Sequence, residues 1–241
     1  MATKFSPSIN VVRDQGEDFG YHLTPNATRV AAEIIDGEKT GIHSFQLIGS
    51  YGTGKSAFLV AFMNWLAGKN KHFGNQGKAK PPKVINLVGE YGSLIDFLAQ
   101  EFEVKNDLSG NQRILDAIHE RYEMAGRLFL IIDEFGKFLE YASKHDPERE
   151  MYFIQQLAEF VNKPERNITL IVSLHQSIEA YSSGINAAQR MEWRKVQGRL
   201  RELTFNEPIA QLIHLAASQL ASNGAKVPKG VDLEAIAKLA K

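Results

Sequence analysis

The eight residues GSYGTGKS, at positions 49–56, decide how the rest of this sequence is interpreted. They follow an apolar, strand-like run at residues 45–48 and precede an apolar, helix-like run at residues 57–62. The spacing GxxxxGK[ST] between a strand and a helix is typical of a loop whose backbone N–H groups surround phosphates at a positive helix N-terminus. We expect Lys55 to contact the β- and γ-phosphates and Ser56 to ligate Mg²⁺. The residues expected around the phosphates are Gly49, Ser50, Tyr51, Gly52, Thr53, Gly54, Lys55, Ser56 and Ala57.

An acidic pair follows the most apolar run of the chain. Residues 128–132, LFLII, are all apolar, as in a strand buried on both faces of a parallel sheet, and Asp133 and Glu134 come next. Ligands bind at the carboxyl ends of the strands in such sheets. We therefore expect Asp133 to hold Mg²⁺ through water and Glu134 to polarise the attacking water. The alternative is that the two carboxylates only cap the next helix.

Polar residues also end the next expected strand, at residues 168–172. A polar side chain beside the acidic pair can contact both the γ-phosphate and the attacking water. We rank Gln176 first for this role, His175 second and Ser173 third. For any one of them, the alternative is a polar strand end that merely faces a loop.

A basic segment lies downstream, at residues 192–201. A guanidinium supplied by a neighbouring subunit neutralises charge in the transition state of phosphoryl transfer, with an effect on rate of about 10³- to 10⁵-fold. Arg199 is the first candidate for this role and Arg201 is the second. A solvated basic segment and a DNA-contacting patch are the alternatives.

Strand-like and helix-like segments alternate along the chain, which predicts an α/β fold with a three-layer, doubly wound, five-stranded parallel sheet. The expected strands are residues 43–48, 84–88, 128–132, 168–172 and 203–205. The expected helices run from Pro25 to glycines at 37 and 41, from the phosphate-binding loop to residue 67, and over residues 94–102, 114–124, 135–141 and 148–161. Thr24 and Pro25 are typical of a helix start.

Composition excludes several classes of protein. The 241 residues carry 28 Lys and Arg and 28 Asp and Glu, so no overall charge draws the chain to nucleic acid or to a membrane surface. The absence of cysteine excludes disulfides and thiolate metal sites and fits a reducing compartment. No apolar run is long enough to cross a membrane. We expect a cytoplasmic protein without a membrane partner.

With these features in order, residues 25–208 resemble the core of an AAA+-type ATPase. GSYGTGKS corresponds to Walker A and LFLIIDE, residues 128–134, to Walker B; SLHQ, residues 173–176, falls at the sensor 1 position, with His-Gln in place of the usual asparagine. KVQGRLRELTF, residues 195–205, resembles the arginine-finger segment that precedes a helical lid. The resemblance implies ATP, Mg²⁺ and a homo-oligomer with shared active sites.

The resemblance also implies a division of the chain. Residues 1–206 form the ATPase core, and residues 207–241 are the start of a helical lid that is too short to be complete, so we expect an N-terminal fragment of a longer protein with further domains or protein partners. The phrases DEFGKFLEYA, SLHQSIEAY and EWRKVQGR resemble large bacterial ATP-binding proteins associated with phage-defence loci. That resemblance implies a nucleic-acid-directed machine, and the lysine-rich loop at residues 68–83 is a candidate contact with nucleic acid.

Other interpretations remain open. LSGNQ, residues 108–112, resembles the signature of ABC ATPases, which dimerise on ATP, although its second glycine is missing and Ser109 serves equally as a helix N-cap. Asn162 and Lys163 resemble part of a guanine-binding motif but precede a strand, so we favour adenine, with Tyr21 or His22 against the base. A scaffold that binds ATP and scarcely hydrolyses it is a further alternative.

Overall fold

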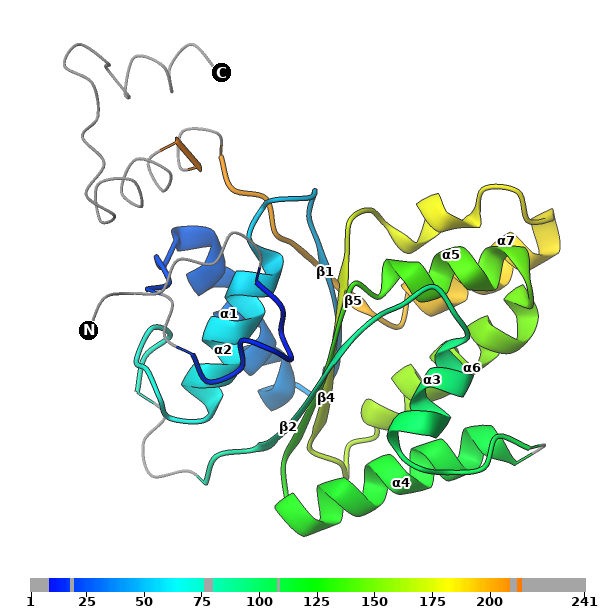
Figure 1. The fold of residues 1–241 in the computed structure, drawn as a ribbon, viewed down its shortest axis with the longest axis horizontal. Coiled ribbons are helices and arrows are strands. Elements are labelled where there is room, and N and C mark those ends of the chain that lie inside the picture. Colours follow the sequence, from blue (N-terminus) through cyan, green and yellow to red (C-terminus); the bar gives the residue numbers. More distant parts are fainter. Residues whose placement is uncertain (1–8, 18–19, 76–79, 108, 209–211, 214–241) are drawn as a thin grey trace.

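Five parallel strands form one sheet in the order β2-β3-β4-β1-β5 in the computed structural model, with helices on both faces (Figure 1). The structure describes residues 9–17, 20–75, 80–107, 109–208 and 212–213. The elements are α1 (Pro25–Lys39), β1 (Ser44–Ile48), α2 (Lys55–Leu66), β2 (Lys83–Val88), α3 (Leu94–Glu101), α4 (Gly110–Ala125), β3 (Leu128–Asp133), α5 (Gly136–Lys144), α6 (Pro147–Val161), β4 (Ile168–Leu174), the short 3₁₀ helix η1 (Ile178–Ser182), α7 (Ala187–Gln197) and β5 (Arg201–Thr204). The predicted α/β fold with a five-stranded parallel sheet is confirmed.

Alternating side chains of the central strands divide the core between the two faces. Phe129 and Ile131 of β3 pack with α1 and α2, whereas Leu130 and Ile132 pack with the layer formed by α3 to α7. In Figure 1 the blue and cyan helices α1 and α2 lie on one side of the sheet, and the green and yellow helices lie on the other. Because both faces are covered, every residue of β3 is buried, as its unbroken apolar sequence predicts.

The first helix begins where the sequence predicts and ends between the two glycines that were expected to end it. Thr24 is its N-cap, with Oγ1 accepting a backbone N–H three residues on at 3.0 Å, and Pro25 occupies the first helical position. The helix ends at Lys39, between the two glycines expected to end it, so Gly37 lies inside its last turn and Gly41 lies just after it. A Cβ at position 37 would lie 2.5 Å from the ring of Phe45, so packing against β1 explains the glycine inside the last turn.

Some boundaries and one whole helix differ from the sequence-based prediction. The helix expected at residues 114–124 begins earlier, at Gly110, and β4 continues two residues further, to Leu174. The sequence analysis did not predict α7, which begins with a capping box between Asn186 and Gln189. Only Trp193 and Val196 of this helix are buried, so its apolar period is too sparse to identify it.

The last part of the chain is described for only a few residues. Of the expected lid at residues 207–241, the structure describes residues 207–208 and 212–213, and the remainder of the lid lies outside the described residues. Within the described ranges, no helix has both the length and the apolar character needed to cross a membrane.

Phe129 tests the packing between β3 and α2. Its ring is fully buried and lies edge-on to that of Phe62 at 6.0 Å. We expect Phe129→Ala to lower the free energy of unfolding by about 3–5 kcal/mol, because it removes a large buried side chain and leaves a cavity. The measurement is urea denaturation followed by circular dichroism. Tyr152→Ala, at a residue that is 58% exposed, is the control and should change the free energy of unfolding by less than about 0.5 kcal/mol; equal effects of both substitutions would contradict this packing.

Candidate nucleotide-binding site

The loop between β1 and α2 contains two left-handed backbone conformations, both at glycines, as its sequence predicts. Gly52 and Gly54 have φ values of 77° and 89°, in the left-handed region that favours glycine. A Cβ at Gly49 would lie 2.2 Å from the backbone oxygen of Phe205, so the chain leaving β5 closes tightly on the start of the loop. The loop therefore adopts its turn through backbone geometry alone, before the first turn of α2.

Lys55 is the first residue of α2 and its ammonium group folds back over this loop. Nζ donates to the backbone oxygens of Gly49 and of Ser50, the latter at 3.0 Å, and the residue is 5% exposed. Burial lowers the pKa of the Lys55 ammonium, and the nearby carboxylates of Asp133 and Glu134 partly offset that effect. A positive charge is thus held at the mouth of the loop, beside the N-terminus of α2.

Ser173 of β4 organises the acidic pair at the end of β3. Its hydroxyl donates to Oδ1 of Asp133 and accepts the backbone N–H of Glu134 at 3.0 Å. Asp133 is 3% exposed and Ser173 is 1% exposed. The sequence analysis ranked Ser173 third as a contact for phosphate and water, but its hydroxyl is instead engaged with the acidic pair.

The backbone turns sharply between the two acidic residues. Glu134 has a φ of 55°, in the left-handed region that non-glycine residues rarely adopt and that is found at functional sites. Its amide also lies 3.1 Å from Oδ1 of Asp133. A Cβ at Gly89, after β2, would lie 2.4 Å from the backbone oxygen of Glu134, so three adjacent strands hold this turn.

His175 links the lysine to the glutamate. Its Nδ1 lies 3.4 Å from Nζ of Lys55, and its Nε2 lies 3.2 Å from Oε2 of Glu134. Tyr51, in the loop between β1 and α2, stacks on the imidazole with ring centroids 3.4 Å apart and an interplanar angle of 24°. Gln176, ranked above His175 in the sequence analysis, is exposed at the next position. Its contact with a γ-phosphate stays a prediction.

Arg199 and Arg201 lie at the opposite end of the strands, beside the amino ends of β1 and β5. Arg201 is paired in register with Phe45 at the start of β1, whereas the glycine-rich loop follows the other end of that strand. Arg199 Nε donates to Glu159 Oε1 at 2.7 Å, and Arg201 lies 3.6 Å from Glu33. Within one chain, neither guanidinium is at the loop. A role for either arginine in phosphate contact therefore requires a second chain.

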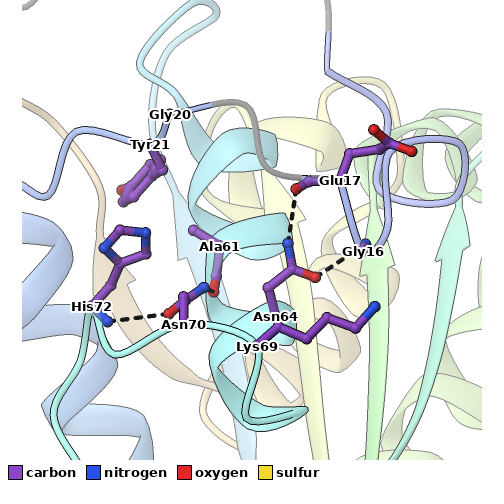
Figure 2. A pocket seen from close by; sticks show the side chains of 9 residues that line it. All are labelled: Gly16, Glu17, Gly20, Tyr21, Ala61, Asn64, Lys69, Asn70 and His72. Atoms are coloured by element: carbon purple, nitrogen blue, oxygen red, sulfur yellow. Dashed lines mark hydrogen bonds between the residues drawn. The ribbon is translucent and has the colours of Figure 1, made fainter. Parts of the chain in front are cut away.

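Tyr21, a candidate contact for the nucleotide base, lies beside the far half of α2. It lines a hollow of about 380 Å³, where its ring meets that of His72 edge-on at a centroid distance of 5.8 Å. Figure 2 shows Asn64 of α2 joined across this hollow to the chain at Gly16 and Glu17. Burial, and then the Glu207 carboxylate, raise the pKa of the Tyr21 phenol. His22 is exposed, and its contact with a base, like that of Tyr21, stays a prediction.

Two competing motifs occupy other parts of the fold. Asn162 accepts the backbone N–H of His43 at 2.7 Å and donates to Ser44 Oγ at 2.6 Å, so it secures the start of β1, at the end of that strand away from the glycine-rich loop. Ser109 sits at the N-cap position of α4 without a side-chain cap, and Asp107 accepts its backbone N–H instead. Leu108, which begins the LSGNQ stretch, lies outside the described residues.

The comparisons with known proteins agree with this geometry at the level of the fold. No protein-family model and no curated protein sequence matches the chain. Among solved structures, it is similar to a Walker-type ATPase of Pyrococcus abyssi, with a TM-score of 0.54 and 13% identity over 99% of this chain and 67% of that one.

Two further structures extend the similarity. The ORC2 protein of Aeropyrum pernix, in ADPNP and ADP complexes, has a TM-score of 0.55 and 14% identity, and AMPPCP-bound DnaA from Aquifex aeolicus has a TM-score of 0.51 and 14% identity. The matches cover 92% and 90% of this chain but only 59% and 58% of those chains, so this sequence spans about three fifths of their length. The chain therefore has the fold of the AAA+, Walker-type P-loop ATPases.

Proposed function

We propose that this chain binds ATP with Mg²⁺ and hydrolyses it. The observation that carries the proposal is the convergence of Lys55, Asp133 and Glu134 at the carboxyl edge of three adjacent parallel strands, where His175 joins the lysine to the glutamate. A buried cation, a buried carboxylate and a half-buried carboxylate next to a glycine-rich helix start are the groups that phosphoryl transfer needs. The nucleotides named with the similar structures, AMPPCP and ADPNP, support ATP as the ligand.

The residues present fit a bound polyphosphate. The glycines at positions 52 and 54 adopt left-handed backbone conformations and place no side chain between the loop amides and a ligand. Helix α2 is twelve residues long and has no acidic residue in its first turn that would repel phosphate. In this mechanism Lys55 moves its charge from the loop carbonyl groups to the β- and γ-phosphates. The loop amides orient the phosphates for in-line attack.

The residues also fit a hydrated Mg²⁺. Ser173 and the amide of Glu134 both approach Oδ1 of Asp133, which leaves Oδ2 without a protein donor in the described part of the chain. Ser56, on the first turn of α2, supplies a hydroxyl near the expected phosphates. When bound, the ion neutralises charge on the phosphate oxygens. Asp133 and Ser56 would hold it from two different elements.

Glu134 orients the attacking water in this proposal, and His175 orients Glu134. The strained turn after Asp133 directs the Glu134 carboxylate toward β4, within hydrogen-bond distance of the His175 imidazole. Arg199, or Arg201 in its place, would complete the site of a neighbouring chain in a homo-oligomer. This requires Arg199 to leave Glu159, which is half-exposed and able to release it to solvent.

We propose that hydrolysis drives assembly or motion of a larger cytoplasmic machine that contains further domains or protein partners. Exposed lysines at positions 69, 71, 80 and 83 support a nucleic-acid contact, because backbone phosphates are bound chiefly by such side chains. The resemblance of DEFGKFLEYA and SLHQSIEAY to defence-associated bacterial proteins supports a defence role. The competing functions are an ABC-like dimer and a scaffold that binds ATP with negligible turnover.

Two substitutions test binding and chemistry separately. We expect Lys55→Ala to abolish binding of a fluorescent ATP analogue, because it removes the cation of the loop. Glu134→Gln should keep that binding and lower steady-state phosphate release by about 100-fold or more, since an amide cannot act as a general base. A wild-type rate near zero that Glu134→Gln leaves unchanged would favour the scaffold instead.

Arg199 tests whether active sites are shared. We expect ATP turnover per chain to rise with protein concentration, and Arg199→Ala to be slower than wild type at every concentration, by about 10³-fold or more, while still binding ATP. Arg201→Ala tests the second candidate in the same assay.

Arg194→Ala is the matched control, because Arg194 is an exposed arginine of α7 that pairs with Glu179. Turnover that does not depend on concentration or on Arg199 would contradict a shared site. Loss of ATP-dependent dimers in Ser109→Arg would then support the ABC-like interpretation.

A further inference from the structure

Tyr51 occupies an unexpected place for a residue of a phosphate-binding loop. Its side chain covers the imidazole of His175 in a close stack, yet Tyr51 as a whole is 74% exposed. One ring face therefore meets histidine while most of the residue faces solvent. A large aromatic side chain that exposed is not part of the core, so its contact with His175 is the feature that calls for a function.

The imidazole beneath Tyr51 has a defined protonation pattern. Nζ of Lys55 carries only donors, so Nδ1 of His175, 3.4 Å away, must accept. Nε2 then carries the ring proton and donates to Oε2 of Glu134 at 3.2 Å. Lysine, histidine and glutamate thus form a continuous chain of hydrogen bonds, assigned from the donors and acceptors of the partners.

The backbone behind His175 is held from the other side. The buried hydroxyl of Tyr181 bonds with the backbone of His175, and burial raises the pKa of that phenol to about 12. A Cβ at Gly136 would lie only 2.2 Å from the same hydroxyl, so Tyr181 also packs closely against the start of α5, which follows Glu134. With the backbone secured, the orientation of the His175 ring depends on Lys55, Glu134 and the stack with Tyr51.

A bound triphosphate is incompatible with this arrangement. The Lys55 ammonium donates to two loop carbonyl groups and to His175, and phosphate oxygens would compete for those same protons. Once Lys55 turns to phosphate, Nδ1 of His175 loses its donor and the loop that carries Tyr51 has to adjust around the ligand. The link from His175 to Glu134 then loses two of its supports at once.

We propose that Tyr51 is a positioning residue that latches His175 onto Glu134 in the nucleotide-free chain, and that a triphosphate on the loop opens this latch. The inference rests on the proposed ATP binding and adds a specific consequence to it. Glu134 is engaged by His175 while the loop is empty and becomes available to water only when phosphate has displaced Lys55. The Tyr51 ring competes with the nucleotide rather than binding it.

Nuclear magnetic resonance of the histidine rings tests the latch without any turnover. The Hε1 resonance of His175, assigned by its loss in His175→Gln, should lie upfield of the other histidines because it sits in the ring current of Tyr51. Tyr51→Phe should keep this shift and Tyr51→Ala should remove it, while Tyr152→Ala is the exposed-tyrosine control. Saturation of the wild type with Mg·AMPPCP should move the resonance downfield. A resonance that ignores Tyr51→Ala, or that stays upfield with nucleotide bound, would overturn the latch.

Affinity gives the second readout. Because the nucleotide no longer has to break an aromatic stack, Tyr51→Ala should bind Mg·AMPPCP about two- to tenfold more tightly than wild type, and Tyr51→Phe should match wild type. Weaker or equal binding by Tyr51→Ala would show that the ring does not oppose the nucleotide. If wild type and Lys55→Ala both fail to bind, the proposed function fails and the opening step with it, whereas the free-protein spectrum still reports whether the stack exists.

Discussion

The parallel pairing of β1, β3 and β4 is the constraint on which the rest of the structure depends. Parallel strands bring their carboxyl ends to one edge, so the loop after β1, the acidic pair after β3 and the histidine after β4 become neighbours. These segments are separated by between 41 and 120 residues in the chain, and nothing local would hold them together. The helices on both faces protect this sheet from water, and α2 supplies Lys55, which lies beside His175.

Two kinds of support operate within the site. The acidic pair is held rigidly, because the Ser173 hydroxyl, the left-handed turn at Glu134 and the close approach of Gly89 all belong to adjacent strands. The side chains of Lys55, His175 and Tyr51 are held by hydrogen bonds and a ring stack that can exchange partners. The sheet thus fixes the acidic pair, while the side chains of Lys55, His175 and Tyr51 can rearrange. A change of side-chain contacts at the loop can therefore alter the contacts of Glu134 without moving the strands.

The carboxyl and amino ends of the parallel strands form two edges of the sheet, and these edges have different chemistry. The edge that follows β1 and β3 combines a buried ammonium group with carboxylates, whereas the other edge carries Arg199 paired with Glu159 and Asn162 securing the start of β1. A single chain cannot bring these edges together, because the strands lie between them. Any contact between the arginines and a phosphate-binding loop is therefore a contact between chains, which links catalysis to assembly in the proposed function.

The sequence by itself determined the fold class, the glycine-rich loop between β1 and α2 and the position of the acidic pair, because spacing, glycine conformation and unbroken apolar strands are local properties. It also identified His175 and Ser173 as polar strand ends, but not their roles. Only the tertiary structure decided that Ser173 braces Asp133 and Glu134, that Gly37 serves packing against Phe45, and that Tyr51 covers His175. Those contacts join residues from different elements of the fold, and α7, with only two buried side chains, depends on the same long-range packing rather than on its own apolar period.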